Sequence, residues 1–148
     1  MNKIQQTIID QAFNIIRENM IGYDVTINEP TAAVQAVQAK IGTCEQEKFG
    51  LIYLTNQNTV IEIEVMFTGT IDSASVYPRE IMRNVLKHNA AAVILFHNHP
   101  SGMCEASQSD KRITTKITEA LQYIDVRVLD HFIVSGTNHM SFAEQGLI

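Results

Sequence analysis

Some segments of the chain have hydrophobic residues at helical spacing, and others have them in short runs or in strict alternation. These two patterns predict the helices and the strands. Apolar residues at helical spacing predict helices over residues 2–20, 31–41, 78–88 and 107–123. Short apolar runs or strict alternation predict strands over residues 49–54, 59–67, 90–97 and 126–134, with a short edge strand at 139–142. Because helices and strands interleave, we predict an α/β single domain around a mixed β-sheet flanked by helices.

The first predicted helix is amphipathic, with Gly22 following it as a stop signal. Such a helix is typical of a packing element or of an arm for a partner chain, and a homodimer through it is one expectation. We therefore divide the chain into residues 1–27, an N-terminal helix and extension, and residues 28–148, the main domain. Residues 23–27 fit either a short strand or a linker. The helix after them is expected to be capped near its start and closed by Gly42.

The charge balance limits the classes of partner. The 148 residues include 16 acidic and 11 basic side chains, a formal net charge of −5, which argues against an extensive phosphate-binding surface. Lys111, Arg112 and Lys116 form a modest basic cluster, for which a solvated helix face is favoured over DNA binding. No apolar run is long enough to predict a membrane span. With two cysteines and no signal-peptide pattern at the start, we expect a reduced, cytoplasmic protein.

Candidate chemistry is concentrated at the end of the predicted strand 90–97. His97 and His99 are two residues apart, so on a strand their imidazoles point to the same side. A Pro-Ser-Gly turn follows, and Asp110 lies at the start of the next predicted helix. Two imidazoles and a carboxylate are a ligand set that suits zinc, and a catalytic zinc keeps a fourth position for water.

Two of these positions have a structural interpretation as well as a functional one. Ser107 and Asp110 have the spacing of a capping box, in which a serine and an acid satisfy the first backbone groups of a helix. An acid in the first helical turn also lies where the helix dipole favours its ionised, metal-binding form. The Ser107 hydroxyl either only caps the helix or donates a hydrogen bond to a developing oxyanion.

Other titratable residues are open candidates. Water activated by zinc needs a base, and Glu47 and Glu45 suit that task equally on chemistry alone, with Glu105 a weaker candidate. Asp130 and His131, adjacent on a predicted strand, fit either hydrogen-bonded support for the metal ligands or a purely structural pair.

The spacing of the central residues resembles the JAMM, or MPN-plus, metalloprotease signature: His97-x-His99, seven residues, Ser107, two residues, Asp110. The run from Glu47 to Leu51 also resembles that family's upstream glutamate and strand start. The chain is most similar to the RadC-like branch, and this resemblance covers residues from about 28 to the end. Its blocks are Gln46 to Phe49, Gly69-Thr70, Pro78 to Glu80, Ala90 to Ala92, His97 to Gly102, Asp130 to Val134, Ser141-Phe142 and Gly146-Leu147.

The resemblance implies a JAB/MPN-type fold, with a cytidine-deaminase-like mixed sheet, and zinc-dependent hydrolysis. One Zn²⁺ would be held by His97, His99 and Asp110, with Glu47 as general base and Ser107 stabilising the tetrahedral intermediate. The expected substrate is a peptide or protein, including isopeptide bonds next to ubiquitin-like partners. The alternative is a non-catalytic or DNA-repair-associated accessory protein with a structural metal site. A zinc nucleobase deaminase is disfavoured, because the H-x-E and P-C-x-x-C motifs of that chemistry are missing.

Two departures from the RadC-like pattern change the expectations. Residues 1–27 are too short for the helix-hairpin-helix region usual in that branch, which weakens an inherited DNA-binding role. Residues 103–106 read Met-Cys-Glu-Ala where prolines are usual, so this loop is expected to be more flexible. Cys104 is expected to be a free thiol. One hypothesis is that its thiolate fills the open zinc position and keeps the enzyme inactive.

Overall fold

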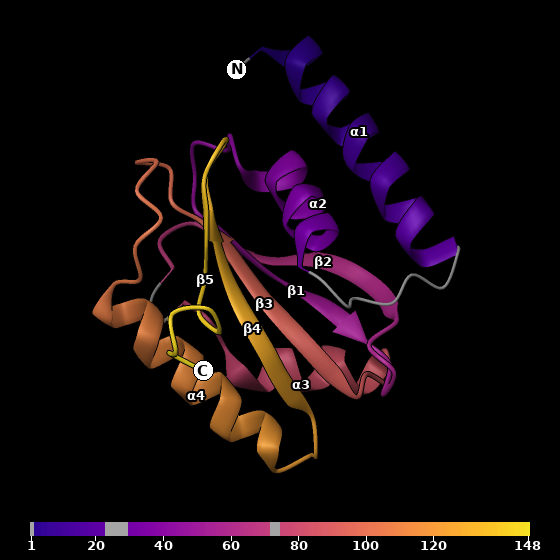
Figure 1. The fold of residues 1–148 in the computed structure, drawn as a ribbon, viewed down its shortest axis with the longest axis vertical. Coiled ribbons are helices and arrows are strands. Elements are labelled where there is room, and N and C mark those ends of the chain that lie inside the picture. The colour runs from indigo at the N-terminus through magenta and orange to yellow at the C-terminus, as the bar shows by residue number, and fades with distance from the viewer. Residues whose placement is uncertain (1, 23–29, 72–74) are drawn as a thin grey trace.

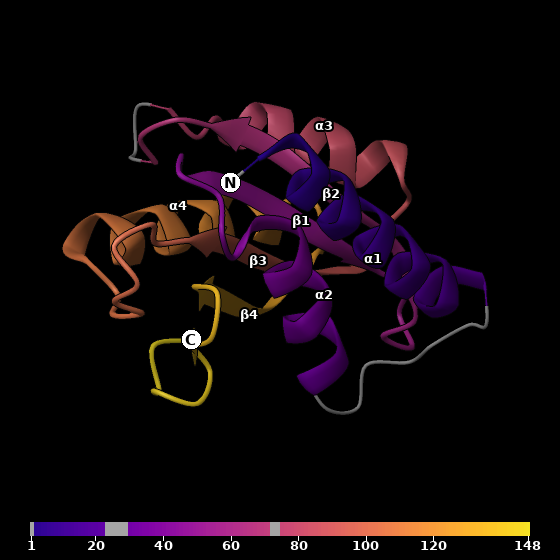
Figure 2. The same cartoon turned by 90° about the horizontal axis from the view of Figure 1, so that it is seen from above.

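The predicted elements form a five-stranded mixed sheet with helices on both faces (Figures 1 and 2). This computed structural model describes residues 2–22, 30–71 and 75–148. In those ranges the helices are α1 (Lys3–Gly22), α2 (Thr31–Ile41), α3 (Pro78–Lys87) and α4 (Gln108–Gln122). The strands are β1 (Lys48–Leu54), β2 (Val60–Thr68), β3 (Ala92–Asn98), β4 (Arg127–Val134) and β5 (His139–Ser141). The prediction of an α/β domain with a mixed sheet is confirmed.

The central strand of the sheet is β3, which is buried along its whole length. The strand order is β2-β1-β3-β4-β5. β1 pairs antiparallel with both β2 and β3, as expected for a hairpin, whereas β4 runs parallel to β3 after the α4 crossover. Because His97 pairs with Phe49 on one side and Ile133 on the other, the C-terminal end of β3 lies between the start of β1 and the end of β4.

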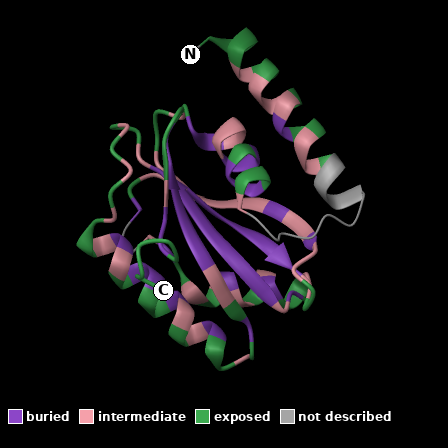
Figure 3. Ribbon diagram, in the orientation of Figure 1, coloured by how far each residue is buried: buried purple, intermediate pink, exposed green. Residues whose placement is uncertain are grey.

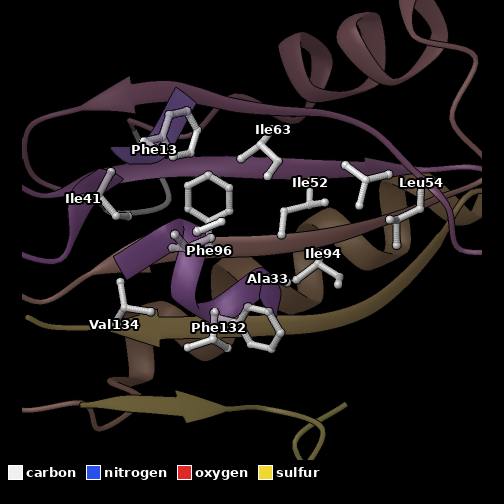
Figure 4. Packing of buried hydrophobic residues seen from close by; sticks show 14 of the residues in the cluster. Phe13, Ala33, Ile41, Ile52, Leu54, Ile63, Ile94, Phe96, Phe132 and Val134 are labelled. Carbon is white, nitrogen blue, oxygen red and sulfur yellow. The ribbon is translucent and has the colours of Figure 1, made fainter. Parts of the chain in front are cut away.

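The central strands of the sheet are mostly buried (Figure 3), and their alternate residues face two separate cores. On one face, Phe96, Phe132 and Ile52 pack against α2 and Phe13 of α1 (Figure 4). On the other face, apolar residues of β1 and β3 pack against α3 and α4, including Ile113 and Ile117. The metal-ligand candidates belong to this second face, at the end where α4 begins. Among the described helices, none is both long and apolar enough to cross a membrane.

Helix α1 packs on α2 and β2 through a mixture of apolar and ionic contacts. Phe13 is buried, Arg17 Nη1 lies 2.6 Å from Glu62 Oε1, and Lys40 Nζ lies 3.1 Å from Asp10 Oδ1. Three large apolar side chains on α1 are instead exposed: Ile4, Ile8 and Ile15. The homodimer expected through this helix stays a prediction.

The helix termini differ in detail from expectation. Helix α1 includes Gly22 rather than ending before it, and the strand or linker expected at residues 23–27 lies outside the described residues. The expected side-chain cap of α2 is wrong, because Pro30 occupies the N-cap position and has no hydrogen-bonding side chain. Gly42 does close α2, with ordinary right-handed backbone angles. A Cβ there would lie 2.6 Å from the Gln38 carbonyl oxygen, so the glycine allows a close backbone approach.

We expect Gly50→Ala to destabilise the sheet that supports the site. A Cβ at Gly50 would overlap the carbonyl oxygen of Glu64 and the ring of Phe96, and a backbone atom inside a sheet cannot easily move away. Overpacking of this kind costs about 1–3 kcal/mol in the free energy of unfolding. Urea denaturation measures the loss. Gly136→Ala is the control, because its Cβ would meet nothing closer than 3.4 Å; equal stability of both variants would contradict the prediction.

Candidate metal centre

The polar side chains of three residues converge where β3 ends and α4 begins. His97 Nε2 lies 2.9 Å from His99 Nε2 and 3.2 Å from Asp110 Oδ1, and His99 Nε2 lies 3.1 Å from Asp110 Oδ2. His97 and Asp110 are buried and His99 is half-buried. Among the described residues, these three form the group of histidine, cysteine and carboxylate side chains that can hold a metal ion.

The spacing and the donor set fit a small transition-metal ion. Bonds of about 2.0–2.1 Å in a tetrahedral zinc site place neighbouring ligand atoms about 3.3 Å apart, close to the separations seen here. His99 Nδ1 lies 2.8 Å from the carbonyl oxygen of Met103, which can only accept, so Nδ1 carries a proton. In the neutral ring, Nε2 then presents a lone pair toward His97 and Asp110. Lone pairs facing one another at this distance favour a cation between them.

Electrostatics at the site favour an ionised carboxylate. Burial opposes the charge of Asp110, but its close polar contacts with His97 and His99 outweigh that effect and hold its pKa well below the usual range. The hydrogen bond to Asp110 in turn raises the pKa of His99, with smaller contributions from the Met103 carbonyl and the charge of Glu47.

The prediction that Ser107 and Asp110 form a capping box is confirmed. Asp110 N donates to Ser107 Oγ at 3.0 Å, and Ser107 N donates to Asp110 Oδ2 at 2.9 Å, which completes a capping box at the start of α4. These bonds fix the Asp110 carboxylate with both oxygens directed toward the histidines. Because Ser107 Oγ accepts in this arrangement, its own proton stays available for another acceptor.

Glu47 lies in the same cleft as these residues. The cleft has a volume of about 610 Å³ and is lined by residues from the loop before β1, the loop after β2 and the loop after β3, including Glu45, Glu47, Ile71, His99, Ser107 and Asp110. Glu47 Oε2 accepts from the backbone N–H of Ile71 at 2.8 Å, and Oε1 has no hydrogen-bond partner among the described residues. Glu45 is exposed on the rim, and Glu105 lines a different hollow.

Asn98 joins the two histidines to the segment that holds Glu47. Its side chain is fully buried, and Oδ1 accepts from Lys48 N at 2.6 Å. Its amide nitrogen donates to the carbonyl oxygens of Cys44 and Gln46. Sequence reasoning missed this role, although a buried polar residue between two candidate ligands was a signal that it needed partners.

Asp130 and His131 have different partners, because His131 contacts a candidate ligand and Asp130 contacts the C-terminal segment. His131 Nε2 lies 2.7 Å from His97 Nδ1, in direct contact with a candidate ligand. Asp130 accepts from the Ser141 hydroxyl and from Ala143 N, and so fixes the C-terminal segment instead. Burial lowers the pKa of His131 well below its ordinary value, and its ring is therefore neutral.

Thr114 is a second residue that sequence reasoning missed. Its hydroxyl lies 2.6 Å from His131 Nδ1 and 2.7 Å from the carbonyl oxygen of Asp110. It stands four residues after Asp110 on α4, and this spacing, which places it on the same helix face, was the available signal.

The unusual loop does not bring its thiol to the ligands. Cys104 lines a separate hollow with Ala106, Lys111, Met140 and others, and it does not belong to the group of converging ligand atoms. The structure therefore gives no support to a Cys104 thiolate at the open metal position. Met103 contributes its carbonyl to His99, while its side chain is exposed.

A sequence model of the RadC-like JAB domain matches residues 27–147. The chain belongs to the RadC-like JAB domain family. Helix α1 lies outside the matched range. The family and the His-His-Asp group, which could hold a metal ion, together point to a metal-dependent hydrolase-like domain.

Relatives of this RadC-like JAB domain differ in length. A UPF0758 protein of Vibrio cholerae is 47% identical over 142 residues, which is 96% of this chain and 89% of that protein. UPF0758 proteins of Pseudoalteromonas translucida and Vibrio atlanticus are 52% and 58% identical over 125 and 104 residues, 84% and 70% of this chain. The chain spans 56% and 46% of those two proteins, about half of their length.

We expect a divalent transition metal to stabilise the domain through His99. At a free-metal concentration 100 times the Kd, binding to the folded state adds about 2.7 kcal/mol to the free energy of unfolding. His99→Ala should lose this gain because it removes one of three ligands. Thermal unfolding with and without Zn²⁺ measures the effect, and metal analysis of the protein gives the stoichiometry. His139→Ala removes an exposed histidine outside the group and should keep the full gain; equal stabilisation of the two variants would refute the site.

Proposed function

We propose that this RadC-like JAB domain is a zinc-dependent hydrolase that cleaves peptide or isopeptide bonds. The observation that supports it most directly is the position of the ligand group at an open cleft that Glu47 and Ser107 also line. Structural zinc sites are closed by four protein ligands. Here three protein ligands converge among the described residues, which leaves room for water and substrate and favours a catalytic site over a structural one.

Zinc is the ion that suits this donor set best. Two imidazole nitrogens and one carboxylate oxygen match the three-ligand pattern of catalytic zinc sites. When bound, the ion would supply Lewis acidity, lowering the pKa of a coordinated water to about 7 and polarising the substrate carbonyl. His97, His99 and Asp110 would hold it.

Glu47 is proposed as the general base. Its Oε2 is fixed by Ile71 N, so the carboxylate is oriented and Oε1 can take the proton of the attacking water. As the C–O bond forms and the C–N bond breaks, that proton passes from Oε1 to the leaving nitrogen. Glu47 ends the reaction ionised, as it began.

Ser107 is proposed to stabilise the tetrahedral intermediate. Its oxygen accepts from Asp110 N, which fixes the hydroxyl at the cleft wall and leaves its proton to donate to a developing oxyanion. The acidic groups that line the cleft, Glu45, Glu47 and Asp110, disfavour acidic side chains next to the scissile bond. The proposed partners are accordingly neutral or basic peptide segments, including the lysine isopeptides of ubiquitin-like conjugates.

The base assignment is tested with Glu47→Gln. The amide oxygen can still accept from Ile71 N, so the variant should bind zinc as the parent does, but it cannot take a proton and should lose at least about 100-fold in turnover. A peptide-library screen of the zinc-loaded protein, with and without chelator, supplies the substrate. Zinc content and turnover of the variant are then measured.

Glu45→Gln is the matched control, because Glu45 is the competing carboxylate on the rim of the cleft. It should keep turnover within a few-fold of the parent. Full turnover by Glu47→Gln would overturn the base assignment. A parent that binds zinc tightly but cleaves no peptide would favour the accessory protein with a structural metal site.

The two roles of Ser107 are separated by Ser107→Ala and Ser107→Thr. Alanine removes the cap and the donor, so we expect a loss of about 1 kcal/mol in stability and of about 100-fold or more in turnover. Threonine retains a hydroxyl that can cap and donate, and should preserve most of both. Chemical denaturation and turnover are measured on the same samples. If Ser107→Ala lowers stability but leaves turnover unchanged, Ser107 only caps the helix and does not stabilise the intermediate.

A further inference from the structure

A buried chain of hydrogen bonds leads from the far nitrogen of His97 to the backbone of α4. His97 Nδ1 lies 2.7 Å from His131 Nε2, His131 Nδ1 lies 2.6 Å from Thr114 Oγ1, and Thr114 Oγ1 lies 2.7 Å from the Asp110 carbonyl oxygen. The exposed fraction is 1% for His97, 1% for His131 and 3% for Thr114. Water is therefore excluded from all three contacts, and the protein groups themselves must supply each donor and acceptor.

The direction of every bond follows from the last acceptor. A carbonyl oxygen can only accept, so the Thr114 hydroxyl donates its single proton to Asp110 O. Thr114 Oγ1 must then accept from His131 Nδ1–H. A neutral imidazole carries one proton, so His131 Nε2 has a lone pair and accepts from His97 Nδ1–H. In the neutral form of His97, Nε2 is consequently left with its lone pair facing His99 and Asp110.

The opposite arrangement breaks the chain at a buried group. If His97 carried its proton on Nε2, His131 would have to donate from Nε2, and Thr114 would have to donate to His131 Nδ1. The Thr114 hydroxyl would then have no proton for Asp110 O, and His97 Nε2–H would occupy the point where the three acceptors converge. The backbone carbonyl of Asp110, one candidate ligand, thus favours the Nδ1–H tautomer of His97, another candidate ligand.

We propose that His131 and Thr114 are positioning residues that hold His97 in the Nδ1–H tautomer, ready to bind a metal ion through Nε2. The proposal rests on the proposed function only in naming zinc as that ion, since the tautomer exists in the metal-free protein. Residues that orient a metal-binding histidine in this way typically contribute 10–100-fold to metal affinity.

Two readouts test the proposal. Long-range ¹H–¹⁵N correlation spectra of the metal-free protein, recorded at mildly alkaline pH, show which nitrogen of His97 carries the proton; we expect Nδ1. Competition with a chromophoric chelator gives the Zn²⁺ affinity, which we expect to fall 10–100-fold in His131→Phe and in Thr114→Val. Phenylalanine can keep the stacking of residue 131 on Phe142, whose ring centroid lies 4.6 Å away, and valine keeps the shape of Thr114.

Conservative variants separate positioning from structural effects. His131→Gln offers an acceptor to His97 Nδ1–H, and Thr114→Ser keeps the hydroxyl, so both should retain zinc affinity within a few-fold of the parent. Asp130→Asn perturbs the neighbouring residue, whose carboxylate fixes the C-terminal segment, and should lower the unfolding temperature without changing the His97 tautomer. If His131→Phe fails to fold, Thr114→Val and Thr114→Ser give the same comparison.

The proposal is overturned by a parent spectrum with the proton on His97 Nε2. Unchanged zinc affinity in both His131→Phe and Thr114→Val, or equal losses in Thr114→Ser and Thr114→Val, would overturn it as well. A parent that hydrolyses no peptide would refute the proposed function while leaving both readouts measurable, so the two failures are distinguishable.

Discussion

The convergence of the His97, His99 and Asp110 side chains, whose nearest polar atoms lie 2.9–3.2 Å apart at a largely buried point, is the constraint on which the arrangement of the site depends. Lone pairs and a carboxylate repel one another when no cation lies between them, so the scaffold must hold them together. It does so with backbone groups: the Met103 carbonyl orients His99, and the first turn of α4 orients Asp110. Backbone groups have no side-chain freedom to lose when the site is ordered, which makes them effective supports.

Capping and metal binding are compatible at Asp110 because they use different properties of one carboxylate. The capping box needs an acceptor for Ser107 N, and a metal ion needs a negative oxygen at the centre of the site. The helix N-terminus favours the ionised form that serves both. Asn98 also has more than one partner. Its three hydrogen bonds to residues 44–48 place the Glu47 segment beside the strand that ends in the histidines. The geometry of the cleft thus follows from the start of one helix and the end of one strand.

The sequence predicted the elements well and nominated three residues that the structure brings together, because both results depend on local spacing. Apolar periodicity locates helices and strands, and the positions of His97, His99 and Asp110 along the chain are enough to nominate them. Local spacing could not predict contacts between distant segments. His131 is 34 positions after His97, and Asn98 is 50 positions after Lys48. Periodicity indicates which face a residue occupies but not which partner it meets there. The family resemblance, not the spacing, singled out Glu47.

The different fates of Asp130 and His131 show why adjacency in sequence misleads on a strand. Successive side chains of β4 point to opposite faces of the sheet, so the two residues meet different neighbours although they are bonded to each other. His131 reaches His97 across the parallel pairing of β3 and β4, whereas Asp130 reaches the Ser141 hydroxyl at the end of β5 and the backbone N–H of Ala143 just after it. Of two adjacent polar residues, one can therefore contact the candidate site while the other stabilises the fold. The strand pairing in the structure shows which residue has which partner.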